Sequence, residues 1–143
     1  MLSSKNLIGS WSLVEFYMET EAGIRSYPFG KLAKGIILYN FDGYMSAVIT
    51  GEHRPVVSAV NLMEGTVEEQ LIKINHLSYS GQFIINGNKV IHYVKVTLFP
   101  KWEGKTLIRF IDLKNDLLTL STEALDSCNE KQKFKFTLKW KKL

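Results

Sequence analysis

Apolar and polar side chains alternate along most of this chain, and residues that favour tight turns separate the alternating runs. Such turns are expected at Asp42-Gly43, at Asn86-Gly87-Asn88 and at Asn115-Asp116. Asp-Gly and Asn-Gly readily adopt the positive φ angles of hairpin turns, and alternation with a period of two is typical of strands that bury one face. The pattern predicts an all-β, antiparallel meander of about eight to ten strands, most of them joined to the next by a hairpin.

One segment departs from this alternation. Residues 65–78, GTVEEQLIKINHLS, place their apolar side chains near helical spacing, and Thr66 with Glu69 forms a capping box. We therefore expect one short α-helix there. A long meander has two unpaired edges, and closure of the sheet removes both. The chain is thus predicted to be a single domain, residues 1–143, that forms an up-and-down β-barrel with the helix near one end.

The basic charge of the chain is confined to its last segment. The net charge is +4, yet residues 131–143, KQKFKFTLKWKKL, hold six lysines and no acid, and the remainder has 12 basic and 14 acidic residues. The lysines alternate with the apolar residues Phe134, Phe136, Leu138 and Trp140. This pattern predicts a strand with one face in water, so we do not expect a nucleic-acid partner.

The remaining composition points to a protein without a membrane or secretory segment. No apolar run approaches the roughly 20 residues of a membrane span, and the first residues lack the apolar core of a secretory signal. Cys128 is the single cysteine, which excludes an intrachain disulfide. These features predict a cytoplasmic protein.

His92 is the most informative polar residue of the predicted strands. If Lys95 and Thr97 face water, alternation turns the other set of side chains, His92, Val94, Val96 and Leu98, into the barrel. The opposite phase would bury Lys95, which is costly without a partner. His92 is then either a hydrogen-bonded interior residue or a polar group that orients a ligand or moves a proton. If the protein has a catalytic residue, we expect it to be His92. No metal site is predicted, because no second His or Cys lies at ligand spacing.

Several motifs resemble one known family. Gly9-Ser10-Trp11 resembles the Gly-x-Trp start of lipocalins, and GIILYNFDGYMSAVI, YSGQFIINGNKVIHYV and LFPKWEG resemble a lipocalin-like domain family of small bacterial and fungal proteins. The resemblance extends over nearly the whole chain. It implies a lipocalin-like barrel with an apolar cup, in which Trp11 plugs the closed end. It implies no particular ligand.

Arg109 shares the parity of Leu107, Ile111 and Leu113. If that face is the interior, Arg109 needs an anionic partner, which could be Glu15 or a ligand carboxylate. The resemblance to lipocalins offers a structural alternative, in which a basic residue stacks on Trp11. Arg109 and Lys139 are both candidates for that role.

The remaining candidate ligand contacts are Tyr39, Met45, Tyr79 and Trp102. Tyr39 and Met45 flank the Asp42-Gly43 turn, where both phases of alternation are apolar, so their orientation stays open. Tyr79 follows the predicted helix and could reach the mouth of the barrel. Trp102 ends the Phe-Pro-Lys-Trp motif, and it either packs over a barrel end or touches a ligand.

These features favour binding of one small, largely apolar molecule inside the barrel, with no cofactor. An isomerase or cyclase that acts on a small apolar substrate in the same cavity is the first alternative. Allene oxide cyclases offer a comparison by fold alone. The second alternative is a barrel filled by side chains that has a structural role or offers a surface to a partner. The sequence contains no Gly-x-Ser-x-Gly motif and no phosphate-binding glycine loop. It leaves open whether the protein is a monomer or a homodimer.

Overall fold

The computed structural model describes residues 1–52, 75–126 and 133–143. The elements, in chain order, are α1 (Ser4–Leu7), β1 (Gly9–Thr20), β2 (Arg25–Ser26), β3 (Lys34–Tyr39), β4 (Tyr44–Thr50), β5 (His76–Asn86), β6 (Lys89–Thr97), the short 3-10 helix η2 (Pro100–Trp102), β7 (Thr106–Lys114), β8 (Leu117–Ser121), β9 (Leu125–Asp126) and β10 (Lys133–Lys142). Most of the described chain is therefore strand, as the alternation predicted.

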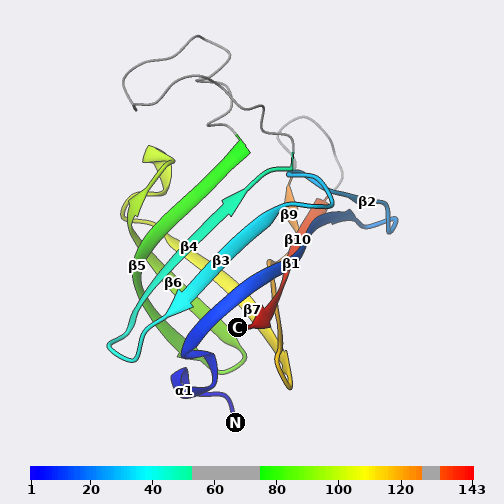
Figure 1. The fold of residues 1–143 in the computed structure, drawn as a ribbon. Coiled ribbons are helices and arrows are strands. Elements are labelled where there is room, and N and C mark those ends of the chain that lie inside the picture. The colour runs from blue at the N-terminus through cyan, green and yellow to red at the C-terminus, as the bar shows by residue number, and fades with distance from the viewer. Residues whose placement is uncertain (53–74, 127–132) are drawn as a thin grey trace.

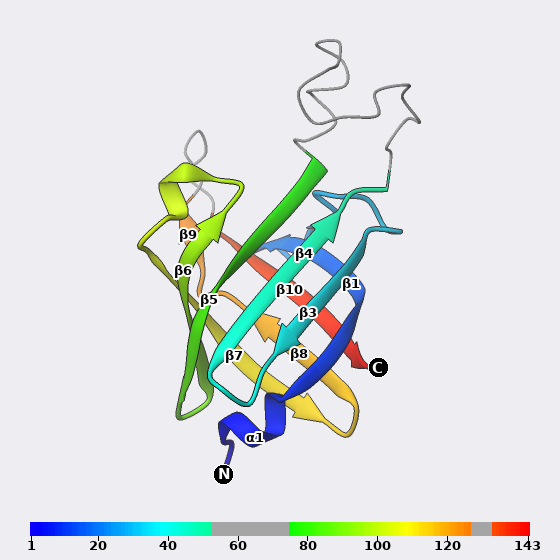
Figure 2. The same ribbon diagram turned by 60° about the vertical axis from the view of Figure 1, so that its left-hand side comes forward.

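The strands form one antiparallel sheet that closes on itself. Their order is β2-β1-β3-β4-β5-β6-β7-β8-β10-β9, and β1 also pairs with β10. The eight longer strands make the barrel, whereas the two-residue strands β2 and β9 attach to its wall. Figures 1 and 2 show α1 across the lower end of the barrel and η2, in yellow-green, near the opposite end. The predicted all-β barrel is confirmed.

The three predicted hairpin turns are present. Gly43 and Gly87 have φ angles of +88° and +62°, and Asn115 has a φ of +55° in the turn between β7 and β8. These residue types tolerate the left-handed region that such turns require. Local turn chemistry thus sets the register of three strand pairs.

The helix predicted over residues 65–78 falls mostly outside the described residues, which omit 53–74, as they also omit Cys128. Its last part is wrong, because His76, Leu77 and Ser78 belong to β5 and pair with β4. The alternation did not indicate helix α1. This helix begins after Ser3, and the side chains of Ser3 and Asn6 form a capping box at its start. No described helix is long and apolar enough to span a membrane.

A β-bulge in β1 changes which side chains face inward. The register shifts between Leu13 and Glu15, so that Val14 is the extra residue and is exposed. Trp11 and Phe16 are therefore both buried in the core, although strict alternation would have put them on opposite faces.

The same bulge turns Glu15 to the outside of the barrel. Its carboxylate lies 3.6 Å from Arg25 and 4.0 Å from Lys139, and it accepts a hydrogen bond from the Tyr27 hydroxyl. Glu15 is therefore not the interior partner of Arg109 that the sequence left open as one of two possibilities.

A second bulge lies in β6. Ser80 pairs with Val96 and Gly81 pairs with Val94, so Lys95 is the extra residue. A side chain at Gly81 would overlap the backbone of β6. Glycine at this position permits the close approach of the two strands that the bulge requires.

The bulge reverses the alternation of the last part of β6. Val96 and Leu98 are exposed, whereas Thr97 lies opposite the buried Tyr79, and Phe99 turns to the interior. Lys95 is exposed as predicted, but the expected inward orientation of Val96 and Leu98 is wrong because one inserted residue shifts the phase.

Candidate functional site

The interior of the barrel contains a cavity of about 260 Å³. Apolar and aromatic side chains from both strands and loops make most of its wall, including Phe16, Phe29, Ile49, Leu77, Phe99 and Phe136. Four lining residues carry polar side-chain atoms: Tyr79, Trp102, Arg109 and Trp140. The inward-facing side chains of this barrel therefore leave space for one small ligand, as they do in some other barrels of about eight strands.

The six residues predicted to contact a ligand fall into two groups. Tyr79, Trp102 and Arg109 line the cavity. The other three, Tyr39, Met45 and His92, are buried in the barrel but are not part of the cavity wall. The structure therefore resolves the orientation of Tyr39 and Met45, which the sequence left open, as inward.

His92 connects the two groups. Its ring is 1% exposed, its Nε2 lies 2.7 Å from the Tyr39 hydroxyl, and its Nδ1 lies 2.9 Å from the Tyr79 hydroxyl. The imidazole therefore has a hydroxyl partner on each nitrogen. Of the three residues, Tyr79 alone reaches the cavity wall.

The environment keeps all three groups neutral at neutral pH. Burial, aided by the positive charge of Arg109, lowers the pKa of His92 to about 3. Burial also raises the pKa of Tyr79 to about 12 and that of Tyr39 well above its usual value, although Arg109 opposes both shifts. Desolvation disfavours the charged form of each group, which explains why the histidine and the tyrosines shift in opposite directions.

Arg109 faces the interior together with Ile111 and lines the cavity, an orientation that the sequence left open. Its Nη1 donates to the carbonyl oxygen of Ile108 at 2.9 Å. Among the described residues it has no carboxylate partner within ion-pair distance. The guanidinium is thus the one cation that the described part of the chain places in the cavity wall.

The cation that packs on Trp11 is neither Arg109 nor Lys139. It is Lys142, whose Nζ lies 4.8 Å from the centre of the Trp11 ring and donates to the carbonyl oxygen of Ile8 at 2.7 Å. Lys142 is the register partner of Trp11 across β1 and β10, whereas Lys139 lies on the outer face beside Glu15. The parity that Lys142 shares with Trp140 was a signal for this inward orientation.

Trp11 lies at the end of the barrel that α1 approaches. It is 1% exposed, and its indole N–H donates to the carbonyl oxygen of Leu7 at 2.8 Å. Together with Lys142, it ties α1 and the segment before β1 to the barrel interior.

Trp140 is a cavity residue that sequence analysis did not single out as functional. Its ring lines the cavity, and its indole nitrogen is buried without a hydrogen-bond acceptor among the described residues. Its place in the apolar phase of the lysine-rich strand was the available signal, but this phase indicated core packing alone.

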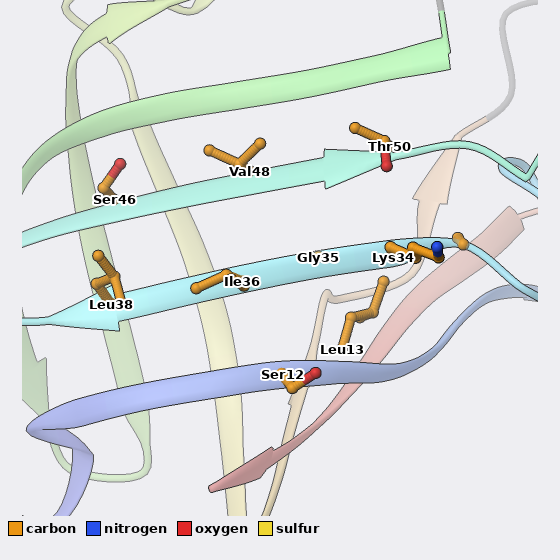
Figure 3. A pocket seen from close by; sticks show the side chains of 10 residues that line it. Ser12, Leu13, Lys34, Gly35, Ile36, Leu38, Ser46, Val48 and Thr50 are labelled. Carbon is orange, nitrogen blue, oxygen red and sulfur yellow. The ribbon is translucent and has the colours of Figure 1, made fainter. Parts of the chain in front are cut away.

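A second and wider depression, of about 540 Å³, lies on the outer surface of the barrel. Figure 3 shows its side chains, among them Ile36, Leu38, Ser46 and Val48, standing on the outer faces of β3 and β4. These residues alternate with inward-facing residues, and Lys34 is the only charged side chain of the lining. The interior cavity, which gathers several polar groups in an apolar enclosure, is the better candidate site.

The described residues bring no three His, Cys, Asp or Glu side chains together in an arrangement that could hold a metal ion. The polar groups at the interior cavity instead are hydroxyl, indole and guanidinium groups, which suit an organic ligand.

Comparison with known proteins agrees with this architecture. Residues 8–143 match the lipocalin-like domain family. Over 87 residues the chain is 33% identical to the 4′-hydroxy-3′-methoxypropiophenone carrier protein of Aspergillus oryzae, and the alignment covers 54% of this chain and 78% of the carrier protein. No solved structure is significantly similar to the chain. The match over nearly the full length, together with the closed antiparallel barrel, shows that the chain belongs to the lipocalin-like domain family.

Proposed function

We propose that the protein binds one small, largely apolar ligand of about the size of a single substituted aromatic ring in the interior cavity. The observation that carries this proposal is the cavity itself, about 260 Å³ in volume and walled mainly by aromatic and aliphatic side chains. This volume lies just below the roughly 300–1,000 Å³ that is typical of small-molecule sites. A ring compound therefore suits it better than a long acyl chain.

The character of the wall supports an aromatic ligand. Phe16, Phe29, Phe99, Trp102 and Phe136 surround the cavity. Aromatic rings pack in edge-to-face and offset arrangements that add to the gain from apolar burial. The similarity to a carrier protein named for a hydroxylated, methoxylated propiophenone supports the same class of ligand.

The alternative of an isomerase or cyclase that uses His92 is less well supported. His92 does not line the cavity, and its two ring nitrogens are already hydrogen-bonded to Tyr39 and Tyr79. A general acid or base must come within hydrogen-bonding reach of the atom that it serves. Its lowered pKa of about 3 also leaves it unprotonated at neutral pH.

The proposal is tested with 4′-hydroxy-3′-methoxypropiophenone as the probe, by titration calorimetry and by quenching of tryptophan fluorescence. The key variant is Ala47→Phe, because Ala47 is buried and lines the cavity. The matched control is Val48→Phe, which adds the same ring to the next residue of β4, on the outer face.

We expect the unmodified protein and Val48→Phe to bind the probe equally well, and Ala47→Phe to lose at least about tenfold in affinity because its ring occupies the cavity. Folding of both variants is checked by circular dichroism. Equal binding by Ala47→Phe would place the ligand elsewhere. No binding of the probe or of other one-ring aromatic compounds by the unmodified protein would favour the filled barrel instead.

A further inference from the structure

The polar side chains that line the cavity have an uneven chemistry. Trp102, Arg109 and Trp140 can only donate hydrogen bonds, and among the described residues of the lining Tyr79 is the one whose side chain can also accept. No Asp, Glu, Asn, Gln, Ser or Thr side chain belongs to the described lining. Whether a ligand must offer a hydrogen-bond donor or an acceptor therefore depends on whether the Tyr79 hydroxyl donates to His92 or accepts from it.

The use of Tyr79 is set by the tautomer of His92. A neutral imidazole has one N–H donor and one acceptor nitrogen, and both nitrogens of His92 face tyrosine hydroxyls. One tyrosine must therefore donate to the ring. The other tyrosine must accept from the ring N–H, and its own hydroxyl proton can then be donated to a further acceptor.

Burial favours one of these two arrangements. Tyr39 is 1% exposed and lies away from the cavity, and His92 is the one partner of its hydroxyl among the described residues, so a spare proton there would have no acceptor in that part of the chain. A buried donor without a partner costs about 1–3 kcal/mol. Tyr79 lines the cavity, where a ligand can provide an acceptor. The favoured tautomer therefore has Tyr39 donating to Nε2 and Nδ1–H donating to Tyr79.

The two distances agree with this direction. Hydrogen bonds with a hydroxyl donor are usually shorter than those with a ring N–H donor. The contact between the Tyr39 hydroxyl and Nε2 is 2.7 Å, and that between the Tyr79 hydroxyl and Nδ1 is 2.9 Å. The shorter contact is thus the one in which a hydroxyl is expected to donate.

From this geometry we infer that the Tyr79 hydroxyl is free to donate a hydrogen bond into the cavity and does so to an acceptor oxygen of the ligand. The site therefore binds aromatic ligands with a carbonyl group more tightly than hydrocarbons of the same shape. His92 and Tyr39 are positioning residues, because they fix the direction of this hydrogen bond without touching the ligand. Arg109 adds a second donor and favours an oxygen that carries partial negative charge. The inference rests on the proposed function, since it specifies which ligands the same cavity prefers.

The first test compares propiophenone with n-propylbenzene, which has a similar shape but no carbonyl oxygen. Affinities of both are measured by calorimetry for the unmodified protein, for Tyr79→Phe and for the control Tyr93→Phe, whose ring lies exposed on the outer face. We expect Tyr79→Phe to lower the ketone-to-hydrocarbon affinity ratio by roughly fivefold to tenfold, with the affinity for the hydrocarbon unchanged. Tyr93→Phe should leave the ratio as it is.

The second test needs no variant and therefore does not depend on folding of Tyr79→Phe. Long-range ¹H–¹⁵N correlation spectra of the unmodified protein distinguish protonated from unprotonated ring nitrogens, and we expect Nδ1 of His92 to be protonated and Nε2 to be bare. A protonated Nε2 would overturn the inference, as would an unchanged affinity ratio in Tyr79→Phe. In both cases binding of the ketone would leave the proposed function intact, whereas failure of both probes to bind would reject the two together.

Discussion

The inward-facing cations at the two ends of the barrel interior, Lys142 and Arg109, have different surroundings. At the end near α1, Lys142 donates to the Ile8 carbonyl and lies over the Trp11 ring. Toward the other end, Arg109 lines the cavity, donates to the carbonyl of its own neighbour Ile108, and has no carboxylate partner among the described residues. Trp11 likewise donates its indole proton to Leu7, whereas the indole nitrogen of Trp140 has no acceptor in the described chain.

This difference separates the end held together by internal hydrogen bonds from the end where we propose that the ligand binds. Polar groups that have hydrogen-bond partners inside the protein stabilise the fold, and their removal lowers the free energy of unfolding. Buried donors without partners cost stability unless a ligand supplies an acceptor. The α1 end is therefore expected to determine the stability of the barrel, and the cavity end its affinity and selectivity.

The largest effect is expected from truncation of one tryptophan at each end, Trp11 and Trp102. Trp11→Ala should lower the free energy of unfolding by about 3–5 kcal/mol, because it opens a cavity in the core and removes the hydrogen bond to Leu7. Trp102→Ala should cost only about 1 kcal/mol, since Trp102 is half-buried, but it should weaken binding of the aromatic probe. Urea denaturation and calorimetric titration measure the two effects. Equal losses of stability would remove the distinction between the ends.

Neutral replacement of the two cations gives the next largest effect. Lys142→Met keeps the length of the side chain but loses its charged hydrogen bond to Ile8, so we expect a loss of about 1.5–3 kcal/mol in the free energy of unfolding. Arg109→Met should change the free energy of unfolding by less than about 1 kcal/mol, because the loss of its hydrogen bond to the Ile108 carbonyl is offset by removal of an interior charge that has no carboxylate partner among the described residues. A greater loss for Arg109→Met than for Lys142→Met would contradict the comparison.

The smallest effect concerns acid stability and His92, which lies between the two ends. Burial lowers its pKa to about 3, whereas a histidine of the unfolded chain titrates near 6.5. Between these values the unfolded state binds more protons, so the free energy of unfolding decreases as the pH falls from about 6.5 toward 3. From pH 7 to pH 5 we expect the unmodified protein to lose about 2 kcal/mol more than His92→Gln.

Gln is a suitable control because its amide has both a donor and an acceptor for Tyr39 and Tyr79. Denaturation curves at the two pH values provide the measurement. An identical pH dependence for both proteins would show that His92 does not titrate as a buried neutral group.

Much of the site could be predicted from side-chain alternation and turn residues. Where alternation predicted the wrong face, the cause is local. His92 faces inward as its parity predicted, and the three hairpins lie where Asp42-Gly43, Asn86-Gly87-Asn88 and Asn115-Asp116 indicated. Parity gave the wrong face for Val96 and Leu98, because they follow the bulge at Lys95, and the bulge in β1 turns Glu15 away from Arg109. A single extra residue reverses every later side chain of a strand.

By itself, the sequence determined the class of the fold: side-chain alternation and turn chemistry are local properties, and they require an antiparallel sheet with one buried face. Only the tertiary structure decided which cation reaches Trp11 and which polar groups share a site. The register of β1 against β10 places Lys142 beside Trp11, and closure of the barrel brings Tyr39, Tyr79 and His92 from three strands into one hydrogen-bonded group. Contacts between residues distant in sequence depend on register and closure, and neither is encoded by the pattern of any one strand.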